Sequence, residues 1–440
     1  MKDLNIKEER ISKLFFGYAV PTIIGICILS LYTLVDSIFV SRYCGELALS
    51  AVEICSPVLS VFSCISIVIG VGANTLIGIS LGEENNEKAS KIFTLSVIMI
   101  LVFALLFGLL MLLFTGQVAS LFGADETVMN YVCDYLKICG WFAPAFLISG
   151  LLSLVMETIG LPVVSMFGNI VSALGNILLD YIFVVKENFG VKGAAVASGI
   201  SVTLSALICL AFFVFKNKKL KICLPDFDLN LIFKMIYNGS SEGLSAVSMG
   251  VISYVYNVFI IKLTDTNHLA SFSVALTVMN FVGSVIIGAS QGINPIVSVN
   301  FGAKKYERVN KAVKIFIFYE IVIALLSDAL ICFVHEPIIG LFAIQNEELT
   351  WTICKAYLPV LVFTPISVVI ISYFTSVNNA KISAILSLFR TFIIRLGVIV
   401  LMYFTLGING IWFSATVSEF ISLIVCLVVY KKENHNICII

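Results

Sequence analysis

Two acidic residues lie inside long apolar segments of the first half of the chain. Asp36 stands in the run LYTLVDSIFVS, and Asp180 stands in GNIVSALGNILLDYIF. A charge at the centre of a membrane helix costs roughly 2.5–3.5 kcal/mol on insertion scales, so each acid needs a polar cavity or a partner. A carboxylate in such surroundings takes up a proton readily, and its oxygens suit a hard cation such as Na+. We therefore expect a proton or Na+ site here, with simple helix packing as the alternative role.

The residues before Asp180 support this expectation. Small and polar side chains recur at helical spacing at Asn169, Ser172, Ala173 and Asn176. Residues three, four and seven positions apart share one face of a helix, so these side chains and Asp180 form one stripe on an otherwise apolar helix. The stripe is expected to face a wet interior.

The second half of the chain carries different chemistry at the matching positions. Asp36 aligns with Asn257, and the stretch that matches the segment of Asp180 contains Arg395 and no carboxylate. The buried acid of this half is Glu242, in NGSSEGLSAVS. We expect Glu242 to attract a cationic substrate or to pair with Arg390 or Arg395.

A proline interrupts another apolar segment of the second half. Gln291 and Asn294 precede Pro295. The proline predicts a kink in this helix. The freed backbone groups are tolerated in a membrane only beside protein or water. Gln291 and Asn294 are therefore candidates for ligand contact, with core packing as the alternative.

These residues belong to a chain that repeats itself. Residues 71–92 and 291–312 are two copies of one segment, with Gly72 matching Gly292 and Asn74 matching Asn294. Two similar hydrophobic halves that meet at a pseudo-two-fold axis enclose a cavity able to open to either side in turn. The duplication is therefore typical of a transporter.

The composition predicts the surroundings of these segments. Of the 440 residues 60% are apolar and 12% are charged, which is typical of a membrane protein. The apolar runs predict an all-α polytopic membrane protein with twelve transmembrane helices, in two six-helix lobes related by a pseudo-two-fold axis along the membrane normal. The expected divisions are an N-terminal lobe at 1–215, a cytoplasmic linker at 216–230 and a C-terminal lobe at 231–440.

The positive charges predict the orientation. Lys and Arg gather in alternate loops, at the N-terminus, in the linker and near Lys431 and Lys432, and they are sparse in the other loops. Lys and Arg accumulate on the cytoplasmic side of membranes. We expect a multi-pass protein of the plasma membrane with both termini in the cytoplasm.

The order and duplication of several motifs make the chain resemble the multidrug and toxic compound extrusion (MATE) transporters. The motifs are KLFFGYAVPTIIG, LYTLVDSIFVSRYCG, GVGANTLIGISLGEENNEKA, GNILLDYIFV with GVKGAAVASGIS, GSSEG, and QGINPIVSVNFGAKKYERV. GSSEG resembles the bacterial multidrug branch. The resemblance implies a twelve-helix antiporter that exports organic cations or drugs against H+ or Na+ by alternating access.

The resemblance also implies site residues. The expected coupling-cation site comprises Asp36, Asn176, Asp180, Ser198 and Tyr135. For substrate contact we carry forward Glu242, Gln291, Asn294, Asn257 and Arg395. An acid found in the tenth span of some members is missing between Lys355 and Asn379.

Other classes of protein fit the sequence less well. A lipid-linked oligosaccharide flippase of the same superfamily stays the main alternative, because Arg390 and Arg395 could meet a pyrophosphate. An enzyme is not expected, since the three His, at 268, 335 and 435, are expected in loops or the tail and no nucleotide-binding motif appears. A channel or receptor would not need two matched halves. We expect a monomer in the lipid bilayer with a small-molecule substrate, no nucleic acid, no cofactor besides the coupling ion, and no metal beyond Na+.

Overall fold

The structure, a computed structural model, is almost entirely helical. It describes residues 4–217, 219–225, 227–264, 266–340, 342 and 346–437. The described residues contain no strand. The predicted linker is described apart from Lys218 and Asp226. The prediction of an all-α membrane protein is confirmed.

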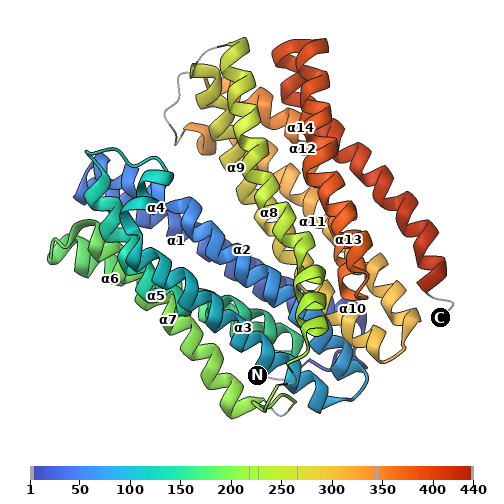
Figure 1. Cartoon of the computed structure of the whole chain (residues 1–440). Coiled ribbons are helices and arrows are strands. Elements are labelled where there is room, and N and C mark those ends of the chain that lie inside the picture. Colours follow the sequence, from blue (N-terminus) through green and yellow to red (C-terminus); the bar gives the residue numbers. More distant parts are fainter. Residues whose placement is uncertain are drawn as a thin grey trace. The chain divides into compact units, whose positions relative to one another are not determined.

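The described residues of the first half form seven α-helices (Figure 1) and one π-helical segment, η1. They are α1 (Ile11–Cys44), α2 (Glu46–Gly82), α3 (Asn86–Leu113), the short α4 (Thr115–Leu121), α5 (Met129–Thr158), α6 (Pro162–Asp180), η1 (Tyr181–Lys186) and α7 (Gly190–Lys216). Helix α5 packs against α2, α3 and α7, and α6 packs against α7.

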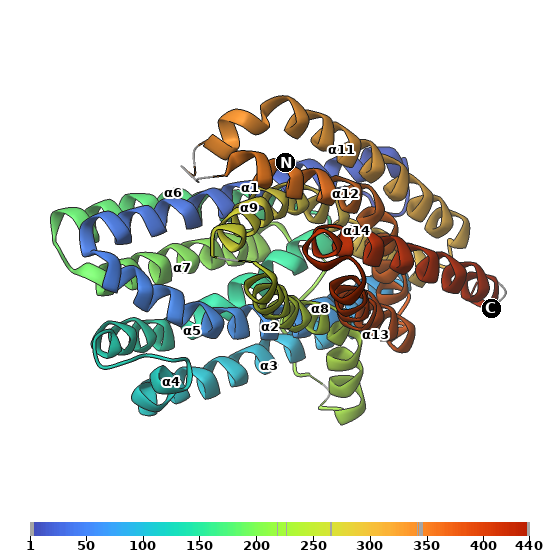
Figure 2. The same ribbon diagram turned by 90° about the horizontal axis from the view of Figure 1, so that it is seen from above.

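The second half repeats this plan with its helices divided differently. They are α8 (Leu229–Leu263), α9 (Thr266–Ser290), α10 (Ile293–Gly302), α11 (Tyr306–Gly340), α12 (Glu347–Ser376), α13 (Ala380–Leu388), the π-helical η2 (Phe389–Ile393) and α14 (Ile394–Ile437). Helix α12 packs against α9, α11 and α14. Figure 2 shows these helices in a view of the whole chain from above.

Among the described residues, eleven helices are long and apolar enough to cross a membrane. The last of them, Ala380–Glu433, has 54 residues and holds two spans. They are separated at Gly407, whose φ of 60° and ψ of −137° are not helical. Such backbone angles are open essentially to glycine alone. Counting this pair separately gives the twelve spans that the sequence predicts.

The backbone repeats where the sequence repeats. The loop after α2 places Glu84 at φ 63°, and the loop after α10 places Lys304 at φ 56°. The next residue donates its backbone N–H in the same way in both copies, from Asn85 to the Ser80 carbonyl and from Lys305 to the Asn300 carbonyl. The duplicated sequence therefore builds the same turn twice.

By packing, the chain divides into two compact units. One contains residues 4–6 and 20–239 within the described part, and the other contains residues 7–19 and 240–437. The first turns of α1 therefore belong with the second half, and the first turns of α8 belong with the first half. The lobe boundaries expected from the sequence follow chain order, and they stay a prediction.

Two matched glycines accommodate these exchanged helix ends. A Cβ on Gly72 of α2 would lie 1.9 Å from the carbonyl oxygen of Met235 in α8. A Cβ on Gly292, the repeat equivalent, would lie 2.4 Å from the Cβ of Tyr18 in α1. The missing side chains allow backbones to approach closely, as small residues do between membrane helices.

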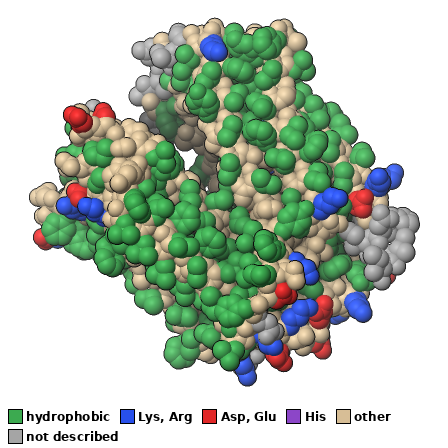
Figure 3. Space-filling view, in the orientation of Figure 1, with side chains coloured by type: hydrophobic (Ala, Val, Ile, Leu, Met, Phe, Trp, Pro, Cys, Tyr) green, Lys and Arg blue, Asp and Glu red, His purple; other side chains and the backbone are tan. Residues whose placement is uncertain are grey.

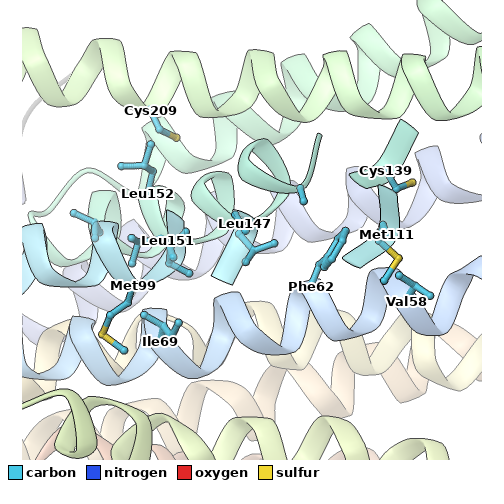
Figure 4. Packing of buried hydrophobic residues seen from close by; sticks show 14 of the residues in the cluster. Val58, Phe62, Ile69, Met99, Met111, Cys139, Leu147, Leu151, Leu152 and Cys209 are labelled. Atoms are coloured by element: carbon cyan, nitrogen blue, oxygen red, sulfur yellow. The ribbon is translucent and has the colours of Figure 1, made fainter. Parts of the chain in front are cut away.

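Apolar side chains fill the interior and also cover the outside. The core of the first unit includes Phe62 of α2, Met99 of α3 and Leu147 of α5 (Figure 4). Hydrophobic side chains are also spread widely over the face seen in Figure 3, as lipid contact requires.

The expectation that all three His lie in loops or the tail is wrong for two of them. His268 lies in α9, and His335 lies in α11, stacked on Trp351 with ring centroids 3.9 Å apart.

Candidate functional site

Helix α6 presents its polar stripe to two neighbouring helices. A Cβ on Gly25 of α1 would lie 3.0 Å from Nδ2 of Asn169, so α1 passes close to the start of the stripe. A Cβ on Gly168 would lie 2.9 Å from Oγ of Ser205 in α7. The glycines thus let α6 pack tightly with α1 and α7, which fixes where the polar side chains point.

The two acids predicted from the sequence meet in the first unit. The carboxyl groups of Asp36 in α1 and Asp180 at the end of α6 are close enough to interact directly. Asp180 is fully buried, and neither of its carboxyl oxygens has a hydrogen-bond partner among the described residues. One oxygen of Asp36, Oδ1, likewise lacks a partner there.

The remaining members of the predicted cation site lie around this pair. Nδ2 of Asn176 donates a hydrogen bond to Oγ of Ser198 in α7 at 3.2 Å, while Oδ1 of Asn176 is buried without a partner among the described residues. Tyr135 of α5 is 3% exposed and lies within electrostatic range of Asp36. Asp36, Asn176, Asp180, Ser198 and Tyr135 therefore come together, on four helices of one unit.

The arrangement has the chemistry of a site for a proton or a small hard cation. Within the part of the chain that the structure describes, four buried oxygens of this site lack donors: two on Asp180 and one each on Asp36 and Asn176. A buried acceptor without a donor costs about 1–3 kcal/mol. Two adjacent carboxylates in an apolar interior also repel each other unless a positive charge joins them. A shared proton would relieve the repulsion, and a Na+ ion would in addition find the oxygen ligands that hard cations prefer.

Tyr32 belongs to this neighbourhood and was not predicted. It lies one turn before Asp36 on α1 and within electrostatic range of both Asp36 and Asp180. The sequence feature that indicates Tyr32 is its position four residues before Asp36, because residues four apart share a helix face.

The second unit contains a separate cluster of charged residues inside the membrane segments. Nε of Arg390 lies 2.6 Å from Oε1 of Glu419, and this side chain of Glu419 is 5% exposed. Arg390 also interacts electrostatically with Glu242 of α8. Of the two arginines expected as partners for Glu242, the structure thus places Arg390 near it, and Arg390 is already paired with Glu419.

Glu419 is a functional candidate that the sequence analysis does not identify. The sequence feature that indicates Glu419 is a series of serines at intervals of four residues around it, Ser414, Ser418 and Ser422. All three serines are buried on α14. A polar helix face of this kind indicates that α14 meets polar groups rather than lipid.

Arg395 occupies the neighbouring part of the same cluster. Its Nη1 donates to Oγ of Ser418 at 3.2 Å, and its guanidinium interacts with Tyr256 of α8. The hydroxyl of Tyr256 is in turn hydrogen-bonded to Oγ of Ser414 at 2.9 Å. Arg395 is therefore held by hydroxyl groups and by the Ala415 carbonyl, within electrostatic range of Glu419.

The other predicted substrate residues are dispersed. Gln291 lies in the turn between α9 and α10, Asn294 lies in the first turn of α10, and Asn257 lies on an exposed part of α8. The predicted interruption near Pro295 is confirmed, since the eighth span breaks at Gln291 and Gly292. Substrate contact by these three residues stays a prediction.

Comparisons with known proteins agree with one another. The profile of the MatE family matches residues 21–182 and 243–401. The chain is 26% identical to the multidrug export protein MepA of Staphylococcus haemolyticus, over 99% of this chain and 97% of the relative, and 25% identical to MepA of Staphylococcus aureus, over 99% and 98%.

Solved structures show the same fold. One is described as the outward-facing conformation of a multidrug resistance MATE family transporter, and it superposes with a TM-score of 0.91 at 22% identity, covering 99% of both chains. Another, of a MATE protein in the straight conformation, gives a TM-score of 0.92 at 22% identity over the same shares. The family profile covers most of the chain, the fold is that of MATE transporters, and the chain belongs to the MATE family.

Proposed function

We propose that this MATE family member exports organic cations or drugs from the cytoplasm by antiport with H+ or Na+ through alternating access. The observation that carries the proposal is the pair Asp36 and Asp180, buried together in the first unit with oxygens that lack donors among the described residues. The pair gains a favourable partner only when a proton or cation binds. Occupancy of the site therefore changes the interaction between α1 and α6.

An ion gradient supplies enough free energy for such export. The membrane potential contributes about 2.3 kcal/mol per elementary charge for each 100 mV. A pH gradient contributes about 1.4 kcal/mol per unit for each proton. Since about 1.4 kcal/mol corresponds to a tenfold concentration ratio, one ion can drive a drug roughly tenfold or more uphill.

The second unit is the proposed location of substrate binding. Its carboxylate Glu242 would attract a cationic substrate, because charge interactions are stronger in a medium of low polarity than in water. Arg390 opposes this attraction, but its ion pair with Glu419 offsets part of its charge. The relatives named above are multidrug export proteins, which supports a small-molecule substrate for this chain too.

A lipid-linked oligosaccharide flippase is the second candidate. It is favoured by Arg395, a guanidinium inside the membrane segments that donates hydrogen bonds to the Ser418 hydroxyl and the Ala415 carbonyl. Pyrophosphate would pair with such a group. The pairing of Arg390 with Glu419 argues against a strongly positive cavity.

We also propose that both termini are cytoplasmic, that the protein lies in the plasma membrane, and that it acts as a monomer with no cofactor besides its coupling ion. The distribution of Lys and Arg supports the orientation.

Transport by the purified protein in liposomes tests the function. A fluorescent organic cation is placed on one side, and a pH gradient or a Na+ gradient is imposed in turn. Movement of the dye against its own gradient with either ion supports antiport and identifies the ion. Absence of dye movement with both gradients, together with movement of a labelled polyprenyl pyrophosphate, would favour the flippase.

A further inference from the structure

The second unit contains a buried acid that neither the cation pair nor the charged cluster uses. Glu320 lies on α11, 14 residues beyond the first residue of that helix, Tyr306. A rise of about 1.5 Å per residue places it roughly 20 Å along the helix, which is near the middle of a membrane span. Glu320 is fully buried.

One hydroxyl group accounts for the hydrogen bonding of this carboxyl. Oγ of Ser290 donates to Oε2 of Glu320 at 2.7 Å, while Oε1 is buried without a partner among the described residues. Helices α9, α10 and α12 pack against α11, and no charged side chain from the described residues of these elements or from the start of α1 interacts with Glu320. The described part of the chain therefore supplies no cation to balance a negative charge on this carboxyl.

Glu320 also lies beside an interrupted helix. Ser290 is the last residue of α9, and the helix breaks at Gln291 and Gly292 before α10 begins. Pro295 has no backbone N–H, so the carbonyl of Gln291 loses the helical donor four residues later. In membrane transporters, the carbonyl ends of broken helices are where small cations are coordinated.

The start of α1 covers this region. A Cβ on Gly292 would collide with Tyr18, so the α1 backbone runs directly over the break. Phe15 packs on both Phe316 and Tyr319, with ring centroids 4.9 and 5.0 Å apart, on the turn of α11 that leads to Glu320. These aromatic contacts lie next to Glu320 on α11, whose burial raises the cost of leaving its carboxyl charged.

Of the two halves of the duplication, only the second carries an acid at the position of Glu320. The repeat offset of about 220 residues aligns Glu320 with Ile100, a fully buried apolar residue of α3. An apolar side chain is thus sufficient for packing at this position of the fold.

We propose that Glu320, together with the hydroxyl of Ser290 at the carbonyl end of α9, forms a second binding site for a monovalent cation, H+ or Na+, in the second unit. The first turns of α1 cover this site, and the later turns of the same helix carry Asp36. One helix therefore touches both sites, and the proposal does not depend on which substrate is exported.

Infrared difference spectroscopy of purified protein in detergent tests the site directly. The Asp36→Asn, Asp180→Asn double variant is used as the background, so that the first pair does not contribute. Acidification protonates the other carboxyls of the chain as well, so the double variant is compared with a triple variant that also carries Glu320→Gln. The acid-induced spectrum of the double variant minus that of the triple variant is expected to contain one protonated-carboxyl band, equivalent to one group per chain. If Na+ competes for the site, NaCl should reduce the band at fixed pH and KCl should not.

Two further variants make the result specific. Asp328→Asn, on the same helix two turns later, should leave the band unchanged. Ser290→Ala should shift its frequency, because the hydroxyl donor to Glu320 is lost. Two results would overturn the proposal: identical spectra for the double and triple variants, or a Glu320 band that responds to neither pH nor Na+, which would make Glu320 a permanently neutral packing group.

Discussion

At the residue scale, the candidate cation site of the first unit holds several buried oxygens that have no donor among the described residues. Asp36, Asn176 and Asp180 contribute them from α1 and α6. An isolated buried acceptor is a cost to folding, but several that converge form a ligand set once a cation or proton arrives. The neighbouring Asn176–Ser198 hydrogen bond holds the amide oriented toward the site.

Glu242 provides a residue-scale prediction about substrate selectivity. Glu242→Gln removes the charge and keeps the shape, so binding of cationic dyes should weaken several-fold while binding of neutral ligands changes little. Fluorescence titration in detergent with a matched cationic and neutral pair measures the difference. Equal losses for both ligands would show that Glu242 has a structural role instead.

The Arg390–Glu419 pair provides a prediction about stability. Removing one partner of a buried ion pair costs roughly 3–5 kcal/mol, because the other charge stays buried without its partner. Glu419→Gln should therefore lower the unfolding temperature in detergent much more than the combined Arg390→Met, Glu419→Leu replacement. A double variant as unstable as the single one would contradict this account of the pair.

The chemistry of the first site could be predicted from the sequence more fully than that of the second. Asp36 and Asp180 stand out as acids in apolar helices, and the stripe on α6 identifies the face they share. The Arg390–Glu419 bridge joins residues 29 positions apart on two helices, and Arg390 lies in a π-helical segment that shifts the helical register. Helical spacing alone could not pair them.

At the element scale, close crossings between helices depend on missing side chains. Gly72 lies against the carbonyl of Met235, and Gly239 lies against the carbonyl of Val68, so α2 and α8 touch through two glycines in the first unit. These contacts hold the first turns of α8 within that unit. A broken eighth span and π-helical segments in the fifth and eleventh spans depart from the uniform helices that hydropathy predicts.

The crossing of α2 and α8 predicts the effect of one added methyl group. Gly239→Ala would place its Cβ 1.8 Å from the Val68 carbonyl, so the helices must separate, and overpacking of this kind costs roughly 1–3 kcal/mol. Gly250→Ala on the same helix is the control, since its Cβ would meet no atom within 4 Å. Thermal unfolding in detergent should show a clear loss for Gly239→Ala only, and equal curves would contradict the close crossing.

At the scale of the whole molecule, duplication explains how one chain acquires two different sites. Both halves build the same turn after their second span, at Glu84 and at Lys304. The halves then differ in the acids within their spans, with Asp36, Glu157 and Asp180 in the first unit and Glu242, Glu320 and Glu419 in the second. Twelve spans and the repeat could be read from the sequence. The exchange of the first helix turns between the units could not, because hydropathy does not record which neighbours a span packs against.

The orientation in the membrane predicts which surfaces are accessible to reagents. Lys221→Cys in the linker and Glu187→Cys after η1 are exposed positions that should lie on opposite sides. A membrane-impermeant maleimide applied to intact cells should label Glu187→Cys above the background of the unsubstituted protein, and should label Lys221→Cys only after the cells are opened. The reverse pattern would invert the proposed topology.

The coupling role of Asp36 and Asp180 is most directly tested by gradient-driven transport in proteoliposomes containing the Asp36→Asn, Asp180→Asn double variant. Amide groups remove the carboxylates that attract the ion but keep the size of the side chains. With folding verified by gel filtration and thermal unfolding, we predict complete loss of uphill transport under an imposed H+ or Na+ gradient, while drug binding in detergent persists. Full coupled transport by the folded double variant would contradict the account and move the coupling site elsewhere in the chain.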